Sequence, residues 1–334
     1  MNMKTKALAL AATLAAFAAP ATAETVLKLG SVSPSGSPWT KWVQDVSDQI
    51  AIASNGELRI ELFLDGQVGD EQTIIRQTVK GRLDLAYVSN VPLALLAEEL
   101  VLPSVANLFD SVDQGTCVAH NHLAAAFSEV MEDSGVVPLT WMEIGHNALF
   151  SKTPIRLPSD LEGLKVRIAP TTADAALTKA LGTSGIPLGI PDAIPGLQTG
   201  TVDAASFPAL VGMSMGIHKI APHVTVTNHS RLIGAVAISK RTWDKLSDQE
   251  KEWLRTFTAD GPKLTEVILA TEEAMLQKIA DAGVQVHYLS DEEQAVWADL
   301  TKSVLQDVVD QTGGQAQAIV EKLIEAKALC GAEN

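Results

Sequence analysis

Predicted strands and helices alternate through the first hundred residues, and this alternation constrains the fold more than any other feature of the chain. Apolar runs typical of strands occur at 25–30, 57–63 and 83–89. Between them the pattern predicts two amphipathic helices, one capped by Ser37 and one capped by Asp70. Strands that alternate with helices form largely parallel sheets. The sequence therefore predicts an α/β protein whose largely parallel sheets are flanked by helices.

The amino terminus has the pattern of a secretory signal peptide over residues 1–23. Two lysines precede an apolar run, and the small residues Ala21-Thr22-Ala23 follow it. The apolar run is shorter than the roughly 20 residues that a membrane-spanning helix needs. We therefore expect export and a periplasmic mature protein, which begins at residue 24.

The length of the chain predicts two lobes rather than one. Its 334 residues exceed the roughly 250–300 at which single cores stop growing. We expect a first lobe from about 24–145 plus part of 230–280. The second lobe is expected from about 146–230 plus long C-terminal helices, and the two lobes are expected to exchange strands. The formal charge of −15 excludes nucleic acid as a partner, because its binding requires clustered basic residues.

The segment 163–170 places Arg167 near the carboxyl end of a predicted strand. Leu164, Val166 and Ile168 alternate with more polar residues, which is the period of a strand with one buried face. Ligands of open α/β sheets bind at the carboxyl ends of strands. A guanidinium group is suited to a carboxylate because it donates two parallel hydrogen bonds and keeps its charge. The spacing leaves open the alternative that Arg167 pairs with a surface carboxylate.

Four segments carry the motifs of one known family in the same order and spacing: LFLDGQVGD at 62–70, GRLDLAYVS at 81–89, LEGLKVRIAP at 161–170 and LQTGTVD at 197–203. They resemble the DctP-type substrate-binding proteins of TRAP transporters. The resemblance implies a two-lobed periplasmic-binding-protein architecture, in which Arg167 clamps a substrate carboxylate and the lobes close by hinge motion. It further implies delivery of a small organic acid to integral membrane subunits, without enzymatic activity, cofactor or metal. We expect a monomer, although the sequence does not determine the oligomeric state.

The same resemblance assigns further ligand positions residue by residue. Asn147 stands where many members have a second arginine, and Phe207 stands where they have a binding asparagine. The remaining implied positions are Ile190, Ser89 and Asn90. With one strong cation and an added aromatic side chain, the predicted ligand is a monocarboxylate with an apolar or aromatic body. For Trp39, at the start of the first predicted helix, a pocket role and a packing role both stay open.

One motif suggests an alternative function, a secreted serine hydrolase. Gly212, Ser214 and Gly216 match a Gly-x-Ser-x-Gly pattern, and His287 lies downstream. A nucleophile elbow requires a strand that runs into the turn and a helix that leaves it. The glycines and nearby prolines predict a poor following helix, so we favour a binding protein.

The two cysteines, Cys117 and Cys330, predict a disulfide because exported proteins fold in an oxidising compartment. The alternative is two separate buried thiols. His120 and His122 share a predicted helix with Cys117, but zinc sites need three or four converging ligands, and we expect none here.

Overall fold

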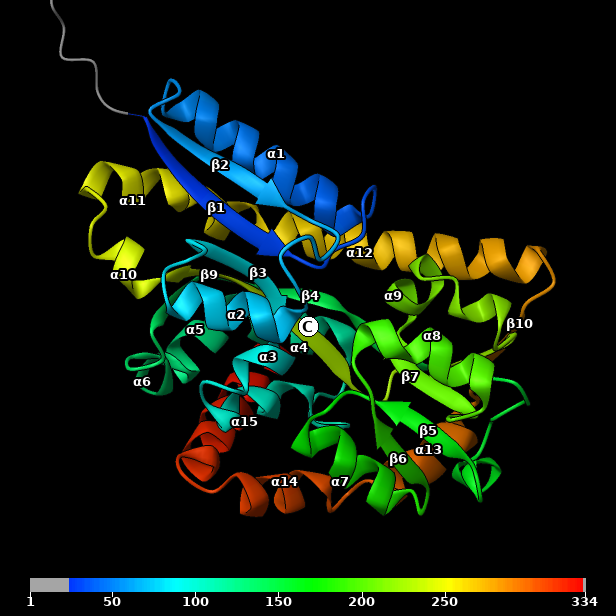
Figure 1. Cartoon of the computed structure of the whole chain (residues 1–334). Helices are drawn as coiled ribbons and strands as arrows, with labels where there is room; N and C mark the ends of the chain where they lie inside the picture. Colours follow the sequence, from blue (N-terminus) through cyan, green and yellow to red (C-terminus); the bar gives the residue numbers. More distant parts are fainter. Residues whose placement is uncertain (1–23, 333–334) are drawn as a thin grey trace, which may run out of the picture.

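The structure is a computed structural model that describes residues 24–332 (Figure 1). The predicted signal peptide, residues 1–23, lies outside the described residues. Within the described range, no helix has the length and apolar character needed to cross a membrane.

Strands and helices alternate as the sequence predicts. The strands are β1 (Thr25–Ser31), β2 (Leu58–Phe63), β3 (Leu85–Ser89), β4 (Val136–Ser151), β5 (Lys165–Ile168), β6 (Ser184–Pro187), β7 (Ala204–Pro208), β8 (His223–Val226), β9 (Arg231–Ser239) and β10 (Gln285–Tyr288). The α-helices are α1 (Pro38–Ala53), α2 (Glu71–Val79), α3 (Asn90–Leu93), α4 (Val112–Asn121), α5 (Leu123–Ala126), α6 (Ser128–Met131), α7 (Thr172–Ala180), α8 (Ile190–Thr199), α9 (Ala209–Ser214), α10 (Lys240–Trp243), α11 (Asp248–Leu254), α12 (Thr256–Asp281), α13 (Asp291–Leu300), α14 (Val304–Thr312) and α15 (Ala316–Ala332). Three short 3₁₀ helices complete the set: η1 (Glu98–Ser104), η2 (Pro158–Leu161) and η3 (Ile217–Lys219).

The predicted helix starts are present with their caps. The Ser37 hydroxyl accepts a hydrogen bond from the Thr40 backbone amide (3.3 Å), and the Asp70 carboxylate accepts one from that of Thr73 (2.8 Å). These bonds satisfy amides that the first turn of a helix leaves without intrahelical partners. Local sequence therefore fixes where α1 and α2 begin.

Strand β4 joins two halves of one continuous sheet with the order β2-β1-β3-β9-β4-β7-β5-β6. Its residues 136–146 pair with β9, whereas residues 147–151 pair with β7 and β8. We call the half with β1, β2, β3 and β9 the first lobe, and the half with β5, β6, β7, β8 and β10 the second lobe. Pairing is parallel among the outer strands, as expected, but antiparallel where β9 and β4 meet their neighbours.

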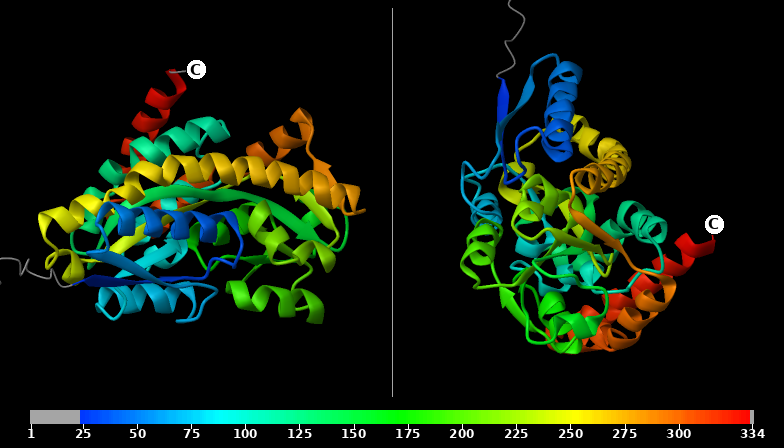
Figure 2. Two further views of the ribbon diagram at one scale, coloured as in Figure 1. Left: turned by 90° about the horizontal axis from the view of Figure 1, so that it is seen from above. Right: turned by 90° about the vertical axis from the view of Figure 1, so that its right-hand side faces the viewer.

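Helix α12 is the second element that extends along both lobes (Figure 2). It packs against α1 and β4, and it also contacts α9 and β10 of the second lobe. Strand β4 and helix α12 therefore both continue from one lobe into the other.

The C-terminal helices, which we expected in the second lobe, pack against both lobes. Trp297 of α13 does pack with Val166 and Ile168 of that lobe. Helix α15, however, packs against α4 and η1 of the first lobe, and α14 contacts both η1 and α7. The buried apolar residues of α15, such as Leu323, join the core cluster that includes residues of α2 and α4.

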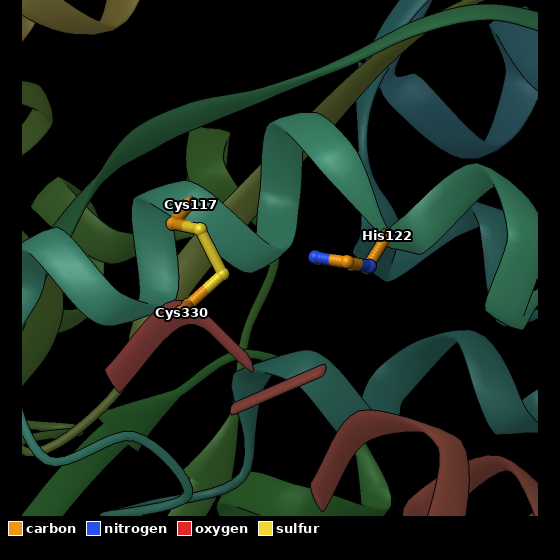
Figure 3. Close-up of side chains that lie close together, drawn as sticks. All are labelled: Cys117, His122 and Cys330. Atoms are coloured by element: carbon orange, nitrogen blue, oxygen red, sulfur yellow. A yellow bond between two sulfur atoms is a disulfide. The ribbon is translucent and has the colours of Figure 1, made fainter. Parts of the chain in front are cut away.

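A disulfide joins Cys117 of α4 to Cys330 of α15, with 5.9 Å between their Cα atoms (Figure 3). It lies where α15 covers the first lobe. The His122 ring lies near it, so that one donor atom of each of the three residues is within 4.8 Å of the others. Because the metal ligand is the thiolate, two sulfurs bonded to one another do not form a zinc site.

We predict that the disulfide holds α15 on the first lobe and stabilises the fold. It spans 213 residues of sequence, and the chain-entropy relation gives about 5 kcal/mol for a loop of that size. Titration of denatured, unreduced protein should therefore find no free thiol, and the double variant Cys117→Ser/Cys330→Ser should lose several kcal/mol in urea unfolding. Two reactive thiols in the unreduced protein would contradict this pairing.

Candidate functional site

A cavity of about 530 Å³ opens between the two lobes. Its first-lobe wall comes from α2, α3 and η1, and its second-lobe wall comes from β5, β7, α7 and α8. Of the predicted ligand positions, six line the cavity: Arg167, Asn147, Phe207, Ile190, Ser89 and Asn90. Parallel β5 and β7 both end at this cavity, which explains why residues distant in sequence meet here.

Arg167 is the central cation of the cavity and is only 4% exposed. Its Nε donates to the Leu188 carbonyl oxygen (2.9 Å), and its Nη1 donates to the Ser206 carbonyl oxygen (2.8 Å). Among the described residues, its Nη2 has no hydrogen-bond partner. Burial lowers the pKa of Arg167 to about 10, while the nearby carboxylates of Asp174 and Glu71 oppose this change. The guanidinium is thus charged at neutral pH, fixed by two carbonyls, and has one nitrogen left to bind a ligand.

Phe207 lies directly against this arginine. The guanidinium carbon is 3.7 Å from the centre of the Phe207 ring, within the range of a cation–π contact. The ring is buried and also lines the cavity. Phe207 therefore supports the guanidinium in addition to offering apolar surface.

Asn147 lies on β4 just after the point where the strand passes from one lobe to the other. Its Nδ2 donates to the Ser230 hydroxyl (2.8 Å), and its backbone amide donates to the Ser230 carbonyl oxygen (2.9 Å). Ile190 opens α8 and lines the cavity with its half-buried side chain. These two residues add a neutral polar group and an apolar surface, but no charge.

The first-lobe wall contains a carboxylate that the sequence analysis did not identify. Glu71, the first residue of α2, accepts hydrogen bonds from the backbone amide (2.6 Å) and the hydroxyl (2.9 Å) of Ser89. Burial raises the pKa of Glu71 above its ordinary value, although the Ser89 bonds and the charge of Arg167 oppose the increase. Its position directly after the capping Asp70 was the only available signal.

Asp174 is a second missed carboxylate, on α7 in the second lobe. It accepts a hydrogen bond from the Ala169 backbone amide (3.0 Å), and burial raises its pKa to about 6 against the attraction of Arg167. Two carboxyl groups, Glu71 and Asp174, thus act electrostatically on the same arginine.

Trp39 does not belong to the site. It is 3% exposed, packs in the core cluster with Trp42 and Val43, and does not line the cavity. The packing role that the sequence left open is the one observed, because the first turn of α1 presents this side chain to the core.

A second arginine, Arg231, lines the cavity at the start of β9 and was also missed. Its Nε donates to Glu143 Oε2 (2.8 Å), and its Nη2 also bonds to that oxygen; Glu143 is fully buried. The carboxylate neutralises this cation, so Arg231 does not provide a second free positive charge.

Glu272 of α12 lies behind this part of the cavity, beside the glycine at the crossing of β4. A Cβ at Gly145 would approach its Oε2 to 3.2 Å. The carboxylate accepts a hydrogen bond from the Leu210 amide (3.3 Å). Burial raises the pKa of Glu272 to about 7, and the neighbouring charge of Glu143 contributes to this increase.

The geometry required of a serine hydrolase is absent around Ser214. This residue is exposed and is the last residue of α9, so no strand leads into it and no helix leaves it. The Nε2 of downstream His287 instead lies 3.0 Å from the Nδ1 of His223, within hydrogen-bond distance. The Gly-x-Ser-x-Gly match therefore reflects a helix terminus and not a nucleophile elbow.

Comparison with known proteins gives a consistent result. The family model described as "Bacterial extracellular solute-binding protein, family 7" (DctP) matches residues 29–312. The C4-dicarboxylate-binding periplasmic protein of Rhodobacter capsulatus is 25% identical over 313 residues, which is 92% of this chain and 93% of the relative. The resemblance found in the four sequence segments is thereby confirmed.

Two solved structures show the fold. A TRAP periplasmic solute-binding protein from Xanthobacter autotrophicus with bound β-D-galacturonate has a TM-score of 0.82 at 23% identity, covering 90% of this chain and 99% of that one. Another from Haemophilus influenzae with bound L-gulonate has a TM-score of 0.85 at 19% identity, covering 91% and 100%. The predicted two-lobed α/β architecture is confirmed.

We predict that Glu272 makes the stability of the protein fall as pH rises. Its pKa is about 7 in the folded state, against an ordinary value of 4.5. The folded state therefore binds the proton of Glu272 more tightly than the unfolded state does. The contribution of this proton to the free energy of unfolding is complete below pH 4.5 and is lost above pH 7. Glu272→Gln removes the charge and should be more stable than the wild type above pH 7, by up to about 3 kcal/mol, with no difference below pH 4.5.

Urea unfolding at several pH values measures this difference, and the exposed neighbour Glu273→Gln is the matched control. A gain in stability that does not change with pH would contradict the assignment.

Proposed function

The chain belongs to the DctP-type family of extracellular solute-binding proteins, which are binding proteins and not enzymes, and on this premise we propose that it captures a small organic acid for a TRAP transporter. The ligand carboxylate binds Arg167 in the cavity between the lobes. The membrane subunits of the transporter receive the ligand from the periplasm, and the protein acts as a monomer that docks to them.

The observation that carries this proposal is the incomplete pairing of Arg167. This buried guanidinium has two nitrogens bonded to carbonyls and one nitrogen without a partner among residues 24–332, and no carboxylate of those residues is hydrogen-bonded to it. A carboxylate satisfies both the charge and the remaining donor. The alternative from the sequence, a surface carboxylate as the partner, does not agree with a side chain that is 4% exposed.

The ligand we propose is a monocarboxylate with an apolar or aromatic body. The cavity lining includes the apolar side chains of Val32, Val101, Ile190 and Val211. The second arginine, Arg231, is already neutralised by Glu143. A second ligand carboxylate would therefore be desolvated without a cation, at a cost of several kcal/mol.

Ligand capture is proposed to proceed by closure of the two lobes. The cavity walls come from different lobes, and the lobes are connected through β4 and α12. A ligand that contacts both walls favours the closed state by its differential affinity for that state. Binding then needs no covalent step.

We predict that Arg167 is required for binding of any carboxylate. A hydrogen bond to a charged group contributes about 1.5–3 kcal/mol. Arg167→Ala should therefore reduce the affinity for organic acids by a factor of about 10–150 or more. Arg167→Lys retains a charge but loses the planar fork, and it should be impaired as well. Calorimetric titration with acids found by thermal-shift screening measures both.

Arg156 provides the matched control: its side chain is 42% exposed and pairs with Glu293 outside the cavity, and Arg156→Ala should bind organic acids as the wild type does. Unchanged acid binding in folded Arg167→Ala would overturn the proposed site.

We predict that Phe207 acts on every carboxylate through the arginine. Phe207→Leu removes the ring face that contacts the guanidinium, and a cation–π contact contributes about 0.5–2 kcal/mol. The variant should therefore reduce the affinity for all organic acids by a similar factor of about 2–30. Phe207→Tyr keeps the ring and should bind normally. A loss confined to aromatic acids would instead show that the ring contacts only the ligand body.

A further inference from the structure

The first-lobe wall of the cavity contains a buried hydrogen-bond acceptor without a donor. Asn90 is 1% exposed, and its Nδ2 donates to the Leu100 carbonyl oxygen and the Ser104 hydroxyl, both at 2.9 Å. The carbonyl can only accept, so the amide orientation is fixed. The Oδ1 of Asn90 has no partner among the described residues. A buried acceptor in this state costs about 1–3 kcal/mol, which a ligand that supplies an N–H or O–H group removes.

The carboxylate of Glu71 lines the same wall. Ser89, the residue before Asn90, donates to both of its oxygens, which fixes the carboxylate in position. Each oxygen can accept a further hydrogen bond. Glu71 and Asn90 together thus present acceptors only, and the first-lobe wall is suited to a donor group of the ligand.

The charges around the cavity favour a donor that is positive. Arg167 interacts with two carboxylates, Asp174 and Glu71, and Arg231 is neutralised by Glu143. The exposed carboxylates of Asp65, Asp70 and Asp192 also line the opening. An organic anion without a positive group would add one more negative charge to this excess. A ligand that also has an ammonium group would add none.

We propose that the ligand is a zwitterion, in which the carboxylate binds Arg167 and a protonated amine donates to Glu71 and Asn90. This inference rests on the proposed function and names the class of acid: an amino acid with an apolar body. A quaternary ammonium group is excluded because it has no N–H to donate to Asn90. A hydroxyl group would satisfy Asn90 but would bring no positive charge to Glu71.

A matched set of small molecules tests the proposal on the mature protein. Calorimetry measures the affinity for three amino acids: leucine, phenylalanine and 6-aminohexanoate. Each is compared with the amine-free acid of the same carbon skeleton: 4-methylpentanoate, 3-phenylpropanoate and hexanoate. Leucine and phenylalanine are also compared with the corresponding 2-hydroxy acids. At least one amino acid should bind about tenfold or more tightly than its amine-free and hydroxy counterparts, as a charge-assisted hydrogen bond requires. Its N-trimethylated derivative should bind no better than the amine-free acid.

The variant Glu71→Gln separates this role from a structural one. This variant should bind the amino acid about tenfold or more weakly than the wild type does, and it should bind the amine-free acid with unchanged affinity. The preference for the amino acid over the amine-free acid then disappears. Glu61→Gln makes the same change at an exposed residue of β2 that does not line the cavity, and it serves as the matched control, with the preference retained.

The outcomes distinguish the two proposals. If amine-free or hydroxy acids bind as tightly as the amino acids, the zwitterion is overturned and the organic-acid function stands. The same holds if Glu71→Gln weakens both kinds of acid equally. If no acid of the set binds to the wild type, both proposals are overturned.

Discussion

The sharing of β4 between the lobes is the constraint on which the cavity depends. The strand pairs with β9 before the crossing and with β7 and β8 after it, and its register with β9 is broken between Glu143 and Gly145. Gly145 has φ of 142°, a conformation that glycine adopts without steric cost. Two residues further on, Asn147 enters the cavity wall. Because the crossing lies so close to the cavity, a rotation of one lobe against the other changes the cavity directly.

The two buried arginines differ in how their charges are compensated. Arg231 is bonded to the carboxylate of Glu143, whereas Arg167 is bonded to carbonyl oxygens and an aromatic ring. Removing a cation from water without a bonded counterion costs several kcal/mol. The fold has already expended that energy at Arg167, so a ligand carboxylate gains most of the attraction there and little at Arg231. The Nη1 of Arg231 also lacks a partner among the described residues, but the charge of Arg231 is paired, and this difference is the reason for proposing Arg167 as the carboxylate site.

Local sequence signals predicted more of the fold than of the candidate site. The alternation of strands and helices and the caps at Ser37 and Asp70 act over a few residues, and each was read correctly. The packing of α15 on the first lobe depends on contacts between distant segments, which the local pattern of the sequence does not contain. Glu71 and Asp174 were missed for the same reason: only the folded chain brings these carboxylates near Arg167.

The two walls of the cavity have opposite chemistry, and this asymmetry connects the fold to selectivity. The second lobe contributes a donor, Arg167, and the first lobe contributes the acceptors Glu71 and Asn90. In a closed protein, any polar group that the ligand does not satisfy is left without water, at a cost of about 1–3 kcal/mol. A ligand with only one polar end would incur this cost on one wall. In the proposed mechanism, selectivity follows from closure, since only a ligand that is complementary to both walls stabilises the closed state.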